Sequence, residues 1–416
     1  MMKKLTLALA LVAAGFVSAD AQAKKPPPPA PTPKEVGPAK PDADMQQVLD
    51  AYQALGPKPL DTLTAEEARK QPTPTDAANA VLAKQQSGKP EPEKVAKVED
   101  RKIDGPDGNQ LAVRIYTPAG PGPFPMIVYY HGGGWVIANL DVYDATPRAL
   151  ANAAGAIVVS ADYRQAPEHK FPAAHEDAFA AYQWAVGNAV SLNGLPRQIA
   201  VAGESAGGNL AINTAIRARD AHIQTPVHML LVYPVAGKDM TTASYVANAD
   251  ARPLGKAGMQ WFVKQVFQTP EQTADPRIDL VSRNDLAGLP SATVITAEID
   301  PLRSEGQALA GKLTAAGVKV DAIDYKGVTH EFFGMGAAVG KAKQAQQRAG
   351  KNLKAAFVAS EKGQRATLLS SESWTADNTM QVQPASLRMP RDSAPPTSSS
   401  RSDEPTVQPL TPRALR

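Results

Sequence analysis

One serine of this 416-residue chain lies on a turn that could expose it as a nucleophile. The apolar run Ile199–Ala202 leads into Gly-Glu-Ser-Ala-Gly at residues 203–207, and a helical pattern follows. Such a strand-to-helix turn lifts the serine hydroxyl out of the sheet in a strained backbone conformation, so the flanking positions must lack bulky side chains. Because both flanking residues are glycines, the spacing predicts that Ser205 is the nucleophile of an acyl-transfer reaction.

Three consecutive glycines, residues 132–134, follow another apolar run that begins at Met126, and they stand between Tyr130-His131 and Trp135. Acyl transfer places negative charge on a carbonyl oxygen, and bare N–H groups at the end of a strand can be preorganised to bind that charge. We therefore expect this loop to donate backbone N–H groups. The N–H of Ala206, next to the serine, would supply a further donor.

A serine nucleophile needs a base and an orienting carboxylate, which follow it in the order acid, then histidine, when the serine stands on such a turn. Of the six histidines, only His330 lies beyond the late predicted strands. Asp300 comes just after the apolar run Val294–Ala297, at a strand's carboxyl end, where open α/β sheets build their sites. Glu298 lies two residues earlier and is the alternative carboxylate.

The elements that must position these residues alternate short β-branched runs with longer helical patterns. This alternation is typical of an α/β fold with a mostly parallel central sheet and helices on both faces. The predicted strands are Met126–Tyr130, Ile157–Ser160, Ile199–Ala202, Leu230–Tyr233, Val294–Ala297 and Val320–Tyr325. The predicted helices are Asp177–Val186, Gly208–Arg219, Glu305–Ala316 and Lys341–Val358.

Two short amphipathic helices are predicted ahead of the sheet, over Asp44–Leu55 and Thr64–Lys70. The second begins with a Thr-x-x-Glu capping box at residues 64–67, a pattern that marks a helix N-terminus. Both helices are too small to fold alone. We therefore expect residues 42–70 to lie across the main domain, which spans residues 42–362.

The flanks of the chain have different compositions. Residues 1–23 combine two lysines, a 13-residue apolar run and small residues, as in a secretory signal cut after Ala19, Ala21 or Ala23. The run is too short to span a bilayer, so we expect export, to the periplasm or outside the cell, without stable membrane insertion. Residues 24–41 read as a proline-rich spacer and residues 363–416, rich in Ser, Pro and Arg, as a disordered tail.

Composition excludes several kinds of function. The formal charge is +3, aromatics make up 6% of the chain, and no basic run is interleaved with them, so we expect no nucleic-acid partner. The chain has no cysteine, which excludes disulfides, thiolate metal sites and a cysteine nucleophile. We expect neither a metal nor a cofactor. Nothing in the sequence sets the oligomeric state.

Across residues 42–358 the chain resembles the hormone-sensitive-lipase-like (bacterial family IV) esterases of the α/β-hydrolase superfamily. The resemblance rests on HGGGW at residues 131–135, DYRQAPEHKFP at 162–172, GESAGGNL at 203–210, LVYP at 231–234, DPLRSEG at 300–306 and HEFFG at 330–334. It implies an α/β-hydrolase fold with a small helical cap. It also implies that Ser205 is the nucleophile, His330 the general base and acid, Asp300 the orienting acid, and Gly133, Gly134 and Ala206 the oxyanion donors.

Within this resemblance Asp300 is preferred over Glu298, because the family's acid opens the Asp-Pro-Leu-Arg motif. His131 is then a support of the glycine loop. Two departures are mild: Gln165 stands where leucine is usual, and Glu204 where aspartate is commoner.

The resemblance implies a serine carboxylesterase that acts on small-molecule esters with short acyl chains of about two to eight carbons, because added methylenes gain nothing once a covered pocket is full. We expect Trp135, Trp261 and Phe262 to line that pocket, with 259–267 completing the cap. Phe262 and Phe267 could equally be helix core. Formamidase, lactonase or deacetylase activity would use the same residues, a true lipase would prefer long chains, and a ligand-binding receptor would lack the histidine.

Overall fold

Within residues 39–379, which the computed structural model describes, eight strands form one sheet in the order β1-β2-β4-β3-β5-β6-β7-β8. From β4 to β8 all neighbours are parallel, whereas β1 and β2 pair antiparallel with each other and β2 with β4. The strands are β1 (Lys97–Asp104), β2 (Gln110–Thr117), β3 (Phe124–Tyr130), β4 (Ile157–Asp162), β5 (Gly194–Glu204), β6 (His228–Val232), β7 (Ser291–Ile299) and β8 (Val320–Thr329).

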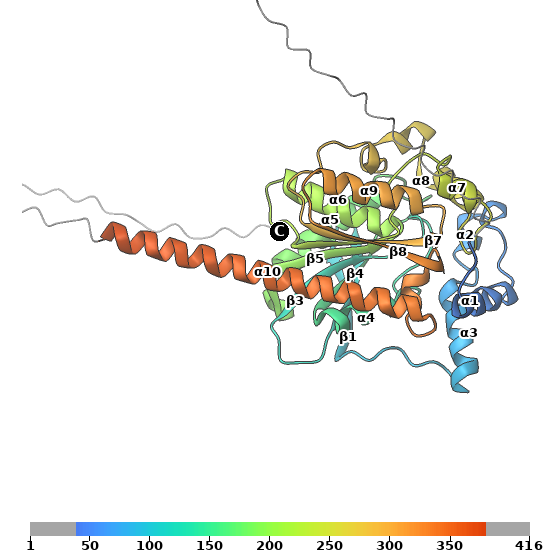
Figure 1. The fold of residues 1–416 in the computed structure, drawn as a ribbon, viewed down its shortest axis with the longest axis horizontal. Helices are drawn as coiled ribbons and strands as arrows, with labels where there is room; N and C mark the ends of the chain where they lie inside the picture. Colours follow the sequence, from blue (N-terminus) through green and yellow to red (C-terminus); the bar gives the residue numbers. More distant parts are fainter. Residues whose placement is uncertain (1–38, 380–416) are drawn as a thin grey trace, which may run out of the picture. The chain divides into compact units, whose positions relative to one another are not determined.

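Helices cover both faces of this sheet (Figure 1). Helices α5, α6 and α9 lie on one face, and α4 with the first part of α10 lies on the other. The helices are α1 (Ala43–Ala54), α2 (Ala65–Ala68), α3 (Pro74–Gln86), α4 (Ala145–Ala154), α5 (Ala173–Asn188), α6 (Ala206–Asp220), α7 (Ala243–Ala247), α8 (Lys256–Val266), α9 (Arg303–Ala315) and α10 (Gly340–Thr379). The predicted α/β fold is confirmed.

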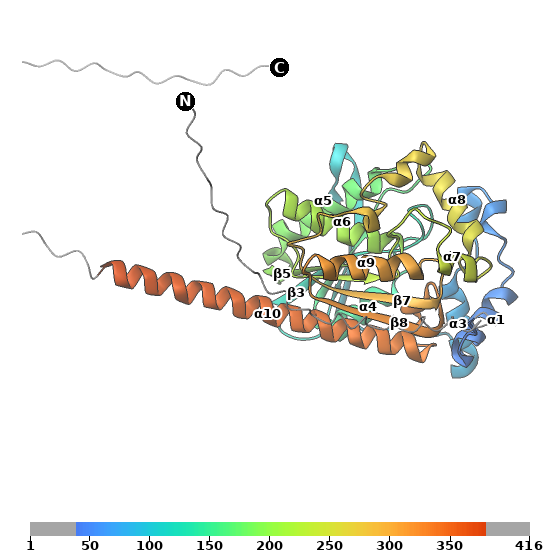
Figure 2. The same ribbon diagram turned by 45° about the horizontal axis from the view of Figure 1, so that its top comes forward.

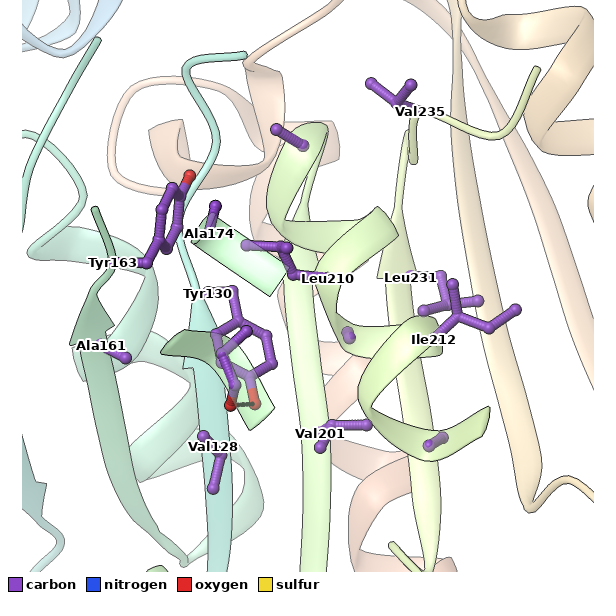
Figure 3. Packing of buried hydrophobic residues seen from close by; sticks show 14 of the residues in the cluster. Val128, Tyr130, Ala161, Tyr163, Ala174, Val201, Leu210, Ile212, Leu231 and Val235 are labelled. Carbon is purple, nitrogen blue, oxygen red and sulfur yellow. Dashed lines mark hydrogen bonds between the residues drawn. The ribbon is translucent and has the colours of Figure 1, made fainter. Parts of the chain in front are cut away.

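The central strands are mostly apolar because both of their faces are buried. Side chains alternate across a strand, so Val128 and Tyr130 of β3 join one core while Tyr129 joins the other. Figure 3 shows the first core, which includes Val128 and Tyr130 of β3, Val201 of β5 and Leu210 of α6. Every predicted strand overlaps an observed one, because burial of both faces gives these strands the apolar runs from which they were predicted.

Two strands and several helices were not predicted. Strand β1 is largely exposed and rich in charged residues, so it lacks the apolar run that marks a central strand. In β2, alternate residues are buried, a period-two pattern that could have identified it. Helix α3 begins at Pro74 behind a Thr73–Asp76 capping box, and α4 is short and alanine-rich.

The helices outside the two layers form a cap, which we define as α1–α3 together with α8. Figure 2 shows α1, α3, α7 and α8 gathered at one end of the sheet. The predicted Thr64–Glu67 capping box is present at the start of α2. Because α3 continues to Gln86, the N-terminal part of the cap is longer than the predicted 42–70. The indole N–H of Trp261 in α8 donates to the Leu63 carbonyl at 2.9 Å, which ties the two parts of the cap together.

The last helix runs further than expected. The chain divides into two units, residues 1–360 and 361–416, and α10 continues to Thr379 instead of ending near residue 358. The tail expected to be disordered from residue 363 is therefore helical over residues 363–379, where no proline interrupts the chain before Pro384. The predicted signal, most of the spacer and residues 380–416 lie outside the described residues.

Candidate active site

Ser205 occupies the sharp turn between β5 and α6. Its backbone has φ 56° and ψ −119°, a conformation that side-chain-bearing residues rarely adopt and that costs about 1–3 kcal/mol. The flanking glycines permit the turn: a Cβ on Gly203 would lie 2.1 Å from the Gly207 carbonyl oxygen, and one on Gly207 would lie 1.9 Å from the Tyr130 carbonyl oxygen. The turn predicted from the Gly-x-Ser-x-Gly spacing is present, and these short distances explain why both flanking residues are glycines.

The structure brings Ser205, His330 and Asp300 together in one hydrogen-bonded row. His330 Nε2 lies 3.0 Å from Ser205 Oγ, and His330 Nδ1 lies 2.7 Å from Asp300 Oδ2. All three side chains are buried, and Asp300 is fully so. The alternative carboxylate, Glu298, is turned away: its Oε2 accepts from the Gly327 N–H at 2.9 Å and its Oε1 pairs with Lys326.

Opposing effects set the pKa of the His330 imidazole. Burial lowers the pKa of its imidazole, but the charge and hydrogen bond of Asp300 raise it, and the more distant carboxylates Glu331 and Glu204 raise it further. The result is a pKa above the ordinary histidine value. A higher pKa makes the neutral imidazole a stronger base.

The glycine loop lies beside the serine and lines the same cavity. Gly133 and Gly134 have φ 91° and 59°, which favour glycine, and a Cβ on Gly134 would lie 2.3 Å from the Phe262 ring. Ala206 is the first residue of α6, where a backbone N–H has no partner within the helix. These three N–H groups are the candidate oxyanion donors.

Outer contacts fix the segment that follows the glycines. Gln165, the departure from leucine, donates to the carbonyls of Ile137 and Ala138 at 3.2 and 2.9 Å. Arg69, at the end of α2, donates to the Val136 carbonyl at 2.8 Å and forms two hydrogen bonds with Glu168. The cap is therefore bonded directly to the segment that follows the glycine loop.

His131 supports the loop from within, as expected. Its Nδ1 lies 2.8 Å from the Gly132 carbonyl oxygen, its ring stacks on Tyr163, and the Tyr163 hydroxyl donates to the His131 carbonyl. His175 is a packing residue: its Nε2 bonds Asn209, and burial lowers its pKa to about 4. Neither histidine contacts the serine hydroxyl.

A cavity of about 640 Å³ opens above Ser205 and His330. Two of the three predicted pocket residues, Trp135 and Phe262, line it. Trp261 does not, which corrects the expectation: its ring packs edge-on against Phe262 and its N–H is bonded to the cap. The hydrogen bond to Leu63 holds the Trp261 ring against the N-terminal part of the cap and not in the cavity wall.

Two glutamates beside the site were not predicted to belong to it. Glu204 is buried next to the serine and accepts hydrogen bonds from the hydroxyls of Tyr129, at 2.6 Å, and Tyr233. Burial, with the charge of Glu331, raises the Glu204 pKa to about 7. Glu331 follows His330 directly and lines the cavity. Its position beside the predicted base was the available sequence signal.

Among residues 39–379 no group of three histidine, aspartate or glutamate side chains is placed to bind a metal ion. No helix in that part of the chain is both long and apolar enough to cross a bilayer.

The chain is similar to known esterases. Residues 127–334 match the family described as alpha/beta hydrolase fold. Carboxylesterase NlhH of Mycobacterium tuberculosis is 41% identical over 269 residues, which cover 63% of this chain and 84% of NlhH. Ethyl acetate hydrolase of Pseudomonas putida is 32% identical over 303 residues, covering 72% of this chain and 92% of that protein. A hyperthermophilic esterase structure from Pyrobaculum calidifontis has a TM-score of 0.69 and 36% identity, covering 76% of this chain and 98% of that one.

The fold, the serine on the sharp turn after β5 and these similarities define the class: the chain belongs to the hormone-sensitive-lipase-like family of α/β-hydrolases. Within that family it is a serine carboxylesterase.

Proposed function

We propose that the protein hydrolyses short-chain carboxylic esters through an acyl-enzyme formed on Ser205. The serine Oγ attacks the ester carbonyl carbon while His330 Nε2 takes the hydroxyl proton. The tetrahedral intermediate carries its negative charge on the former carbonyl oxygen, which the N–H groups of Gly133, Gly134 and Ala206 bind. The bond to the alcohol oxygen then breaks, and the alcohol leaves with the proton returned by His330.

A water molecule completes the reaction by the same steps. His330 removes a proton from the water as its oxygen attacks the acyl carbon, and the second intermediate releases the carboxylic acid and restores the serine hydroxyl. In each half-reaction Asp300 holds Nδ1 protonated and stabilises the imidazolium. No other reactant is needed.

The observation that carries this proposal is the hydrogen-bonded row of the three side chains. The distances of 3.0 and 2.7 Å join atoms from three separate strand ends, after β5, β7 and β8. A nucleophile, its base and an orienting group within hydrogen-bond reach are what acyl transfer needs.

The preference for short acyl chains rests on the cavity. Helix α8 forms an apolar part of its wall with Met259, Phe262, Val263 and Val266, and Phe267, just after the helix, also lines it. Each buried methylene contributes about 0.8 kcal/mol until the space is filled, and longer chains then clash with this wall.

The test is a series of p-nitrophenyl esters from acetate to palmitate. We expect kcat/KM to rise and then fall within about two to eight carbons, since burial contributes about 0.8 kcal/mol per methylene only while space remains. A steady rise to palmitate, with activation at an oil–water interface, would identify a true lipase and contradict the proposal.

We also propose that the protein is exported, on the strength of the lysines, apolar run and small residues in residues 1–23. Fractionation of expressing bacteria should place the enzyme, shortened at its N-terminus, outside the cytoplasm. Full-length active enzyme confined to the cytosol would contradict export without affecting the proposed chemistry.

A further inference from the structure

Glu331 is a carboxylate of the cavity that the triad does not use. Its Oε1 lies 3.8 Å from His330 Nε2, the nitrogen that faces Ser205. Its other oxygen, Oε2, accepts the hydroxyl of Tyr143 at 2.6 Å, which fixes the side chain. In the part of the chain that the structure describes, no hydrogen-bond donor reaches Oε1, and the side chain is 21% exposed. Glu331 therefore presents a fixed, open acceptor to the cavity.

The position of Glu331 identifies which part of an ester it faces. The departing alcohol oxygen must receive its proton from His330 Nε2, so it lies within about 3 Å of that atom. Since Glu331 Oε1 is close to the same nitrogen, the first carbons of the alcohol and their substituents come within its reach. Glu331 borders the alcohol site.

Residues of different chemistry line the cavity. Helix α8 supplies apolar side chains, among them Phe262, which lies against Gly134 of the glycine loop. Tyr52 and Arg252 line the same cavity as Glu331. Burial raises the Tyr52 pKa, while the charge of Arg252 lowers it and that of Glu331 raises it, so these three groups act on one another. The cavity lining around Glu331 therefore includes a polar side chain and charges of both signs.

We propose that the natural substrates are esters of polyhydroxy alcohols, such as glycerol or a sugar, in which a hydroxyl next to the ester oxygen donates to Glu331 Oε1. This inference rests on the proposed ester hydrolysis at Ser205 and names the alcohol that it releases. A site built to bind a hydroxyl discriminates against the analogue that lacks it, because the acceptor that the bound ester covers is then left unpaired. An anionic alcohol would be repelled by the same carboxylate.

The test compares two butyrate esters of three-carbon alcohols, 1-monobutyrin and propyl butyrate, which differ in two hydroxyl groups. In the wild-type enzyme we expect kcat/KM to favour monobutyrin by about tenfold or more, the ratio that corresponds to one hydrogen bond to a charged group. Glu331→Met keeps the side-chain length but removes the acceptor, and should bring the ratio close to one by lowering only the monobutyrin value. Glu331→Gln retains a neutral acceptor and should give an intermediate ratio.

Val266→Ala, in the apolar wall that α8 forms, is the matched control: it should alter the preferred acyl length and leave the alcohol ratio unchanged. Equal kcat/KM for the two esters in the wild type would overturn the inference. So would an equal loss for both esters in Glu331→Met and Glu331→Gln, because Glu331 would then act on His330 or on the attacking water. Failure of the wild type to hydrolyse either ester would instead contradict the proposed function.

Discussion

Replacing Asp300 with asparagine should nearly abolish ester hydrolysis while leaving the fold intact. In the structure Asp300 Oδ1 accepts the Leu302 N–H at 2.8 Å, and Oδ2 faces His330 Nδ1 at 2.7 Å. The asparagine oxygen must stay on the Leu302 N–H, so its NH₂ group faces Nδ1. The imidazole then carries its proton on Nε2, directed at Ser205, and cannot act as a base. A tautomer change of this kind lowers kcat by about 10⁴-fold, or about 5 kcal/mol.

The assay is kcat for p-nitrophenyl butyrate, measured on variants whose melting temperature matches the wild type. Glu298→Gln is the control, because that carboxylate bonds Gly327 and Lys326 and not the histidine. We expect it to retain activity within a few-fold. If Asp300→Asn kept more than a tenth of the wild-type kcat, or if Glu298→Gln were the more damaging change, the assigned row of hydrogen bonds would be wrong.

The remaining predictions concern protonation, packing and the tail. Activity should fall on the acid side with one ionisation whose midpoint lies above about pH 6.5. The pKa of His330 is raised, so the imidazole is protonated below that pH and cannot act as a base. A midpoint well below pH 6.5 would contradict this prediction. Gly207→Ala should yield no active, correctly folded enzyme, judged by circular dichroism and activity, since its Cβ would lie 1.9 Å from a carbonyl oxygen. Trp261→Phe should lower the free energy of unfolding in urea by about 1 kcal/mol, the value of one hydrogen bond, and an unchanged stability would show that the bond is unimportant. Deletion from Gly363 onward should leave activity and melting temperature nearly unchanged, and a large drop in melting temperature would show that this segment packs on the domain.

The residues of the candidate site were predictable because their signals are local. The sharp turn at Ser205 and the glycine loop both require glycine at particular positions, because a Cβ on Gly207 or Gly134 would collide with neighbouring atoms. The choice of Asp300 over Glu298 was different, since both follow the same strand. It came from the family resemblance, and the structure agrees because only Asp300 faces His330.

What the sequence did not reveal depends on side-chain direction and on contacts between distant segments. Trp261 and Phe262 are adjacent in an amphipathic helix, and the phase of that helix relative to the cavity decides that Phe262 faces it. The Glu331 side chain is held in position by a hydrogen bond from the hydroxyl of Tyr143, which lies 188 residues earlier in the chain. Strand β1 is held by its pairing with β2, a tertiary effect that its charged residues conceal.

The central claim is that an acyl group is transferred to Ser205. The most direct measurement is intact-protein and peptide mass spectrometry after inactivation with a dialkyl phosphate ester such as paraoxon, which phosphorylates an activated serine irreversibly. We predict one adduct per chain on the peptide that contains Ser205, loss of activity in proportion to labelling, and no adduct in Ser205→Ala. Complete inactivation with the adduct on another residue, or full activity in Ser205→Ala, would contradict the account.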